Sequence, residues 1–435
     1  MTKKYLGSSS GLTLVTDAGT AFVSSEFNSG HMVGDIKLAT LSDTDDTDVT
    51  GTELVTNGTF DSDSNWIKED GWTISGGVAS YASGTGREIE QSSIPTVAGK
   101  KYVITFDITS ISAGAFGVYS TDTTDSTYVD NYYNSVGTYS RTVTASGSSM
   151  LLRIRNPSTG TVGSIDNVTL RLAEEDRSVN NNGLQVFGTV TKTPVATGAD
   201  LVAYSGFSGS NYLQQPYNSD LDFGTGDFCV MGWVKASYYV SANRCLLARG
   251  LLESPSNRQF LLYLGTSNDV RFYGNGAEVV DSPAILDSWM QVCLLRRSGV
   301  AYLYINGELK DSATYTGDVD VVPQSEVRIG RDFYYPNVLY NASIALFRIS
   351  ATAPTAEQIA KIYEDEKVLF QEGAQATLYG SSDAVTALAY DDSTELLHVG
   401  SSAGRSVFSG LRRVDNTTDA VGSAISASNG MVAED

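Results

Sequence analysis

Alternating apolar and polar positions recur along most of the chain and predict β-strands. In KKYVITFDITSIS, residues 100–112, the side chains of Tyr102, Ile104 and Phe106 fall on one side of a period-two pattern. The segments SRTVTAS, MLLRIRN and SIDNVTLRL repeat this pattern, and short turn signals separate them. Residues 51–173 therefore predict one antiparallel sandwich.

A second run of strand patterns follows a polar boundary at residues 173–183, AEEDRSVNNNG. The segment DFCVMGWVKA is apolar on both faces, which indicates a central strand of a sheet. In AYLYINGELKD, two strand patterns meet at Asn306 and Gly307, a pair suited to a type I′ turn because both central residues need positive φ. A second antiparallel sandwich is predicted over residues 184–370, so the fold class is all-β with two tandem sandwiches.

One segment has helical rather than strand periodicity. In APTAEQIAKIYEDEK, Thr355 and Gln358 have the spacing of a capping box. Ile359, Ile362 and Tyr363 then fall on one face. We therefore expect one short surface helix that closes a sheet.

The two ends of the chain show weaker strand patterns. Residues 1–50 are polar and predict a small β segment for attachment or linkage. Residues 375–435 predict three short strands, which resemble one blade of a β-propeller, and a polar tail. One blade cannot bury both of its faces, so we expect the preceding helix to cover one face and neighbouring chains to cover the other.

The charge balance narrows the choice of partners. The 435 residues include 50 acidic and 29 basic side chains, which give a formal net charge of −21. Such a charge repels nucleic acids and anionic membranes, and it leaves carboxylates free for divalent cations. No apolar run approaches the roughly 18 residues of a membrane span, and the N-terminal stretch lacks the apolar region of a secretory signal. We expect neither nucleic-acid binding nor membrane insertion.

The cysteines indicate the redox compartment. Cys229 and Cys293 lie in apolar runs, and Cys245 leaves an odd number in one region. We interpret them as buried free thiols of a protein made in a reducing cytoplasm, with a disulfide as the alternative.

Catalytic patterns are weak throughout the sequence. The only histidines, His31 and His398, are far apart, and the cysteines lack the C-x-x-C spacing of zinc sites. No G-x-S-x-G elbow supports a Ser-His-Asp site, no phosphate-binding loop occurs, and acids on loops do not by spacing define a glycosidase pair. We therefore predict that the protein is not an enzyme.

The stretch ELVTNGTFDSDSNWIKEDGWTISGGVASY, with SIPTVAGKKYVITFDI and the closing SIDNVTLRL, resembles the jelly-roll carbohydrate-binding modules. In that family the first turn and the last strand commonly hold a structural calcium ion. The resemblance implies calcium ligands at Asn57, Gly58, Asp61 and Asp166. The alternative is that Asp61 and Asp166 only cap turns.

Sugar binding would use exposed aromatic rings beside amides and carboxylates. The stretch STYVDNYYNSVGTY, with a tyrosine on a nearby strand, offers such a cluster. The candidate carbohydrate-binding residues are Tyr119, Tyr128, Asp130, Tyr132, Tyr133 and Asn134. Tyrosines on sandwich strands also serve as packing residues, and that alternative stays open.

The second unit resembles the concanavalin-like, laminin-G-type lectin sandwich. The resemblance rests on LDFGTGDFCVMGWVKA, SWMQVCLLRRSGVAYLYINGELKDSA, SEVRIGRDF and SIALFRISATAPTAEQIAKIYEDEK, in that order. It implies that Trp233 and Trp289 belong to core strands. Hydrolases of this fold carry paired acids in E-x-D-x-x-E, which the strands of residues 201–350 lack.

The order of these units resembles tail fibres and other appendages of bacterial viruses. This resemblance implies a virion protein assembled in the host cytoplasm, with other virion proteins and a bacterial cell-surface glycan as partners. It also implies a homotrimer, because fibre-type appendages are commonly trimeric. The alternatives are an architectural capsid or fibre protein without a ligand, and a glycan-degrading enzyme of concanavalin-like fold.

Overall fold

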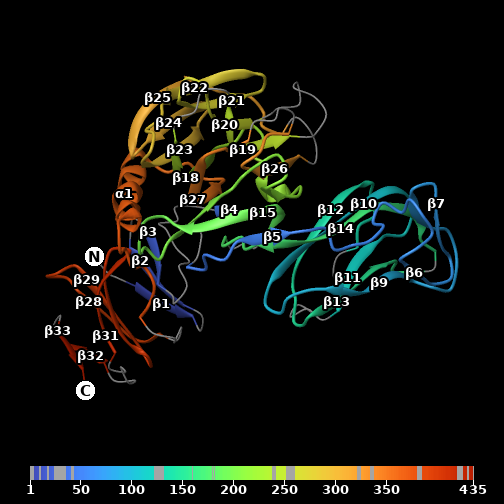
Figure 1. The fold of residues 1–435 in the computed structure, drawn as a ribbon, viewed down its shortest axis with the longest axis horizontal. Coiled ribbons are helices and arrows are strands. Elements are labelled where there is room, and N and C mark those ends of the chain that lie inside the picture. The colour runs from blue at the N-terminus through green and yellow to red at the C-terminus, as the bar shows by residue number, and fades with distance from the viewer. Residues whose placement is uncertain are drawn as a thin grey trace.

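The computed structural model consists almost wholly of antiparallel β-sheets, which confirms the all-β fold class (Figure 1). The structure describes residues 4–8, 11–16, 19–23, 36–40, 44–121, 132–158, 160–178, 180, 182–237, 242–250, 260–320, 325–333, 338–379, 385–418, 425–428 and 431–434. His31, Tyr128 and Asp130 lie outside these residues.

The first sandwich packs two sheets face to face. One sheet has the order β12-β10-β14-β8-β7, from β7 (Trp72–Ser75), β8 (Val78–Tyr81), β10 (Lys101–Ala113), β12 (Gly137–Thr144) and β14 (Val162–Glu174). The other is four-stranded, with the order β11-β13-β9-β6, from β6 (Ile67–Lys68), β9 (Glu88–Pro95), β11 (Gly117–Thr121) and β13 (Ser149–Arg155).

The core of this sandwich follows the alternation in the sequence. Tyr102, Ile104 and Phe106 on β10 all point inward and are buried. Trp66 and Trp72 are buried in the same cluster, where the Trp66 ring lies 5.2 Å from the ring of Phe60. The two tryptophans are therefore core residues.

The second sandwich is larger. One sheet joins β27 (Ala342–Ser350), β18 (Phe228–Ala236), β23 (Trp289–Arg297), β24 (Val300–Ile305) and β25 (Glu308–Thr314), with β16 (Val202–Ser205) beside β27. The other joins β15 (Leu184–Pro194), β17 (Tyr212–Gln215), β26 (Glu326–Ile329), β19 (Arg244–Gly250), β20 (Phe260–Leu264), β21 (Asp269–Gly274) and β22 (Ala277–Pro283).

The apolar faces of these two sheets enclose one continuous core of buried Val, Leu, Ile and Phe side chains. A short 3-10 turn, η1 (Ser219–Leu221), leads into β18. The predicted hairpin turn between β24 and β25 is confirmed, because Asn306 has φ 51° and Gly307 has φ 78°.

The predicted helix is α1 (Ala356–Glu366), and both hydrogen bonds of the Thr355–Gln358 capping box are present. A 3-10 turn, η3 (Lys367–Phe370), follows it. The buried face of α1, with Ile359 and Ile362, packs against Cys229 and Cys293 of the second sandwich. The helix therefore covers the sandwich sheet, and the expectation that it covers the C-terminal sheet was wrong.

The N-terminal 50 residues do not form a separate segment throughout. A three-stranded sheet holds β1 (Lys4–Ser8), β2 (Gly11–Thr16) and β3 (Gly19–Val23). However, β4 (Ile36–Thr40) pairs with β27, and β5 (Val49–Gly51) pairs with β15. Strands β4 and β5 are therefore part of the second sandwich, which corrects the expected boundary at residue 50.

The C-terminal region forms four strands where three were expected. They are β28 (Val385–Asp391), β29 (Leu396–Ser401), β30 (Gly404–Ser409) and β31 (Arg412–Thr417), and a hairpin of β32 (Ile425–Ser428) and β33 (Met431–Glu434) follows. The side chain of Leu411 packs in a cluster with Leu369 and Ala374. The C-terminal sheet therefore packs against the second sandwich of the same chain.

Cys229, Cys245 and Cys293 are buried free cysteines, as predicted. Within the described ranges, α1 and the other helical turns are too short or too polar to cross a membrane.

Candidate functional site

The second sandwich carries a groove of about 560 Å³ on the uncovered part of an outer sheet face. Strands β15, β16, β18, β23 and β27 contribute to it. The lining residues are Thr193, Pro194, Val195, Ala203, Ser205, Gly206, Phe207, Lys235, Ser237, Trp289, Tyr340, Asn341, Ala342 and Ser343. The lining comes from stretches that are far apart in the sequence, and the pairing of these strands brings the stretches together.

Strand register places three lining residues in one row. Lys235 on β18 lies opposite Trp289 on β23 and opposite Ser343 on β27. Side chains directly opposite each other in a sheet project from the same face. An aromatic ring, an ammonium group and a hydroxyl group therefore stand side by side along one row of the groove.

Aromatic side chains also line the groove, Trp289 within this row and Tyr340 outside it. Trp289 is half-buried: its indole N–H donates to the carbonyl of Val195 at 2.9 Å, and its ring lies 4.9 Å from that of Phe370. Tyr340 has 42% of its surface exposed, and Asn341 beside it is exposed as well. Exposed rings with nearby hydroxyl and amide groups are the features that hold a sugar ring.

The first sandwich offers a second exposed face, that of the four-stranded sheet. Tyr119 lies opposite Arg153, and Arg153 lies opposite Glu90. The Arg153 guanidinium is 2.6 Å from Glu90 and 3.1 Å from Glu88, and it covers the Tyr119 ring at 5.8 Å. These charges largely satisfy one another, so the face is less available to a ligand than the groove.

The remaining tyrosine candidates do not act as one cluster. The ring of Tyr133 stacks on Tyr139 at 3.9 Å and meets Phe106 edge-on at 5.9 Å, so it packs against the core. Tyr132 and Asn134 are exposed. Of the described candidates, Tyr119 and Tyr133 therefore have different neighbours, and only Tyr132 and Asn134 are open to solvent.

The predicted calcium residues fall into two groups. Asp166 lies opposite Asp107 in the β10–β14 pairing. Burial raises the pKa of Asp166, and the negative charges of Asp107 and Asp61 raise it further. The structure therefore brings Asp61 and Asp166 within electrostatic reach and adds Asp107, which the sequence reasoning missed.

Asn57 and Gly58 hold the loop itself. The side-chain amide of Asn57 donates to the backbone carbonyls of Ser62 and Ser64, and the backbone carbonyl of Asn57 accepts the indole N–H of Trp66. The Gly58 carbonyl accepts the N–H of Val168 at 2.9 Å. In the described part of the chain, no three His, Cys, Asp or Glu side chains converge as metal ligands. Asp61 and Asp166 thus fit a cation better than Asn57 and Gly58 do.

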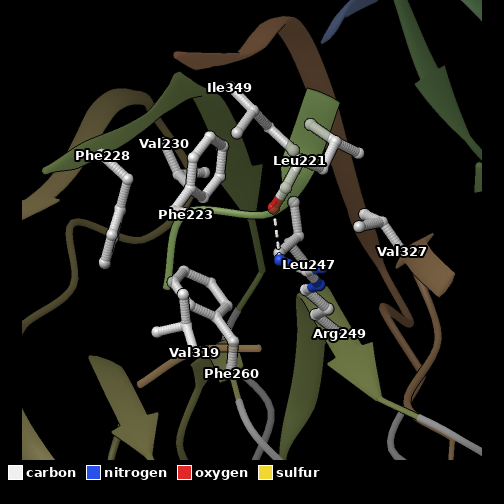
Figure 2. Close-up of a pocket in the computed structure, with 10 residues that line it drawn as sticks. All are labelled: Leu221, Phe223, Phe228, Val230, Leu247, Arg249, Phe260, Val319, Val327 and Ile349. Carbon is white, nitrogen blue, oxygen red and sulfur yellow. Dashed lines mark hydrogen bonds between the residues drawn. The ribbon is translucent and has the colours of Figure 1, made fainter. Parts of the chain in front are cut away.

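A further space lies inside the second sandwich (Figure 2). It measures about 20 Å³, which is room for roughly one water molecule. Its walls are apolar apart from Arg249, whose guanidinium donates to the carbonyl of Leu221 and pairs with Asp222 and Asp320. This space is part of the core and is too small for a sugar.

A family comparison identifies the fold of the second sandwich. Residues 207–360 match the family described as the concanavalin A-like lectin/glucanases superfamily. The chain therefore contains a concanavalin A-like domain, as its four ordered motifs predicted. No curated protein matches the chain.

Similar solved structures cover parts of the chain. The CBM40 module of Ruminococcus gnavus IT-sialidase, bound to α2,3 sialyllactose, is 15% identical, with 32% of this chain and 84% of that chain covered and a TM-score of 0.29. The receptor-binding domain of botulinum neurotoxin C/D mosaic serotype is 12% identical, with 56% and 60% covered and a TM-score of 0.33. Trypanosoma rangeli sialidase in complex with the inhibitor DANA is 14% identical, with 45% of this chain and 31% of that chain covered and a TM-score of 0.34. Likeness at this level carries no functional argument.

Proposed function

We propose that this protein is a non-enzymatic glycan-binding protein, and that it serves as a structural and adhesion component of a bacteriophage particle. The groove on the concanavalin A-like domain carries the proposal, because it sets the Trp289 and Tyr340 rings beside Ser343 and Asn341. A bacterial cell-surface glycan is the proposed ligand, and other virion proteins are the proposed structural partners.

The same groove supports the absence of hydrolase activity. Glycoside hydrolysis generally needs a pair of carboxyl groups about 5–10 Å apart across the scissile bond. Among the described residues that line the groove, none is Asp or Glu. A sugar held there would meet hydroxyl, amide and ammonium groups, which bind but do not supply the acid and the nucleophile.

The virion setting draws on the order of the modules and on the thiols. A jelly-roll-like sandwich, a concanavalin A-like domain and a small terminal sheet follow one another in a chain with three buried free cysteines. Free thiols suit assembly in the reducing host cytoplasm. Copies on one particle would multiply weak single sites through avidity.

Binding to immobilised bacterial polysaccharides tests the proposed function. Tyr340→Ala is expected to weaken binding by about tenfold, since truncating an aromatic contact at the centre of an interface typically costs more than about 1 kcal/mol. Tyr132→Ala removes a comparably exposed tyrosine from the first sandwich and should leave binding unchanged. Reducing-end release is followed in the same samples and should stay at background.

Three outcomes would contradict this account. Loss of binding in Tyr132→Ala, with Tyr340→Ala unaffected, would move the site to the first sandwich. Failure of the wild-type chain to bind any polysaccharide would favour the architectural role, and reproducible release of reducing ends would favour an enzyme.

We also propose that calcium binds between Asp61 and Asp166 and stabilises the first sandwich. A ligand that binds only the folded state adds about 2.7 kcal/mol at a hundredfold excess over its Kd. The first-sandwich transition should therefore melt at a higher temperature in calcium than in chelator, and Asp166→Asn should remove the difference. Asp63→Asn, at an exposed acid paired with Lys68, should retain it. Identical wild-type curves with calcium and chelator would leave Asp61 and Asp166 as turn residues.

A homotrimer is the proposed assembly. The C-terminal sheet has a small apolar cluster, in which Leu397, Val399 and Phe408 pack with Leu378. Three partly buried apolar residues pack against that cluster, namely Val385, Leu388 and Tyr390, and all lie on the edge strand β28. An edge strand with incompletely covered apolar side chains favours contact with another chain.

A further inference from the structure

The charge of the groove is opposite to that of the chain as a whole. The chain carries 50 acidic and 29 basic side chains. The described residues that line the groove include one cation, Lys235, and no acid. An anionic ligand is repelled by most of this surface, so a site for it must be free of carboxylates and must supply a local positive charge. The groove meets both requirements.

Lys235 occupies an unusual position in its strand. It is the one exposed residue of β18, whose other residues are all buried. Trp233, two residues earlier on the same face, is covered by the ring of Phe370 at 4.3 Å and donates its indole N–H to Glu366 at 2.7 Å. Phe370 and Glu366 thus cover this face of β18 as far as Trp233. Lys235 is the first side chain beyond them on that face, and it lines the groove.

The ammonium group of Lys235 is available to a ligand. Within the described residues, no carboxylate lies close enough to form an ion pair with it. Its neighbours across the strands are the ring of Trp289 and the hydroxyl of Ser343. A cation held beside an aromatic ring and a hydroxyl can meet the charged group of a sugar while the ring contacts the apolar face of that sugar.

We propose that the groove recognises an anionic sugar, whose negative group meets the Lys235 ammonium and whose ring lies against Trp289 and Tyr340. This inference rests on the proposed glycan binding and names the ligand class of that same site. A lysine ammonium acts as a point charge, so carboxylate and phosphate groups are both suitable partners. A neutral sugar in the same groove is the competing outcome.

Matched pairs of polysaccharides test the charge requirement with the full-length protein. The first pair is polygalacturonate and its carboxyl-reduced product, and the second is phosphorylated yeast mannan and the same mannan without phosphate. The acidic members of the bacterial panel are each paired with their carboxyl-reduced forms as well. We expect the wild-type chain to bind at least one acidic polymer about tenfold more tightly than its neutral partner, as suits a hydrogen bond to a charged group.

The variants separate charge from packing. Lys235→Met keeps a long apolar side chain and should lose the preference for the acidic polymer, whereas Lys235→Arg keeps the charge and should retain most of it. Lys100→Met removes the charge of another exposed lysine, in the first sandwich, and should behave as wild type. The carboxylate and phosphate pairs show which anion is recognised.

Three outcomes would overturn the inference of an anionic ligand. Equal binding of acidic and neutral polymers, lost in Tyr340→Ala but unchanged in Lys235→Met, would overturn the anionic ligand and leave glycan binding intact. An acidic preference that persists in Lys235→Met would also overturn it. Absence of binding to every polymer would overturn both this inference and the proposed function.

Discussion

Glu366→Ala is expected to destabilise the concanavalin A-like domain by about 3–5 kcal/mol, the usual cost of removing one partner from a buried ion pair. Glu366 is fully buried at the end of α1. Its two carboxylate oxygens accept from the Trp233 indole and from the Arg348 guanidinium, each at 2.7 Å. Alanine would leave a buried cation and a buried indole N–H without their acceptor.

Differential scanning calorimetry of the full chain measures this effect. A loss of 1 kcal/mol lowers the melting temperature of a domain of this size by about 2–4 °C, so a fall of about 10 °C is expected. Glu364→Ala, on the same helix but exposed and paired only with Lys367, should change little. A Glu366→Ala transition within about 2 °C of wild type would show that the pair does not hold the helix on the sheet.

Removal of residues 380–435 is expected to convert a trimer into monomers. Sedimentation of the full chain should give three times the 46.4 kDa of one chain. The shortened chain should sediment as one copy, because it lacks the edge strand β28 and its apolar residues Val385, Leu388 and Tyr390. The segment through Tyr379 is kept, because residues 375–377 are tied to Gly198 and Asp200 by hydrogen bonds.

A point variant of the complete chain tests the trimer independently, in case the shortened chain unfolds. Leu388→Asp places a charge at the incompletely covered edge and should weaken the trimer in an otherwise complete protein. Asp392→Ala, at an exposed turn next to the same strand, should leave the mass unchanged. A full-length chain that sediments at 46.4 kDa at micromolar concentration would contradict the trimer, and the packing of Leu411 on its own domain would then be the whole role of the sheet.

The sequence predicts best the features that depend on neighbouring residues. The period-two pattern around Phe106 specifies which side chains enter the core. Asn306 and Gly307 specify their turn because few other residues adopt positive φ at both positions. Thr355 and Gln358 specify the start of α1 through hydrogen bonds that span only three residues.

Pairing between distant segments was not predictable in the same way. Residues 36–51 look polar and short, yet β4 pairs with β27 and β5 pairs with β15. Nothing in these strands identifies partners more than a hundred residues away, because backbone hydrogen bonds carry no side-chain signature. The boundary placed at residue 50 failed for this reason.

The groove was missed for the same reason, although one signal was present. The row of Trp289, Lys235 and Ser343 exists only through the register of three strands. A single lysine near the end of the otherwise apolar strand FCVMGWVKA could have indicated where the covered face ends. Asp107 was similarly visible as an acid on a buried strand, but its position opposite Asp166 depends on register.

A crystal structure of the full chain with the tightest-binding oligosaccharide tests the central claim most directly, namely that the groove of the concanavalin A-like domain is the glycan site. The account predicts a sugar ring between Trp289 and Tyr340, with its anionic group within about 3 Å of the Lys235 ammonium nitrogen. A sugar bound on the Tyr119 face of the first sandwich, with the groove empty, would contradict it.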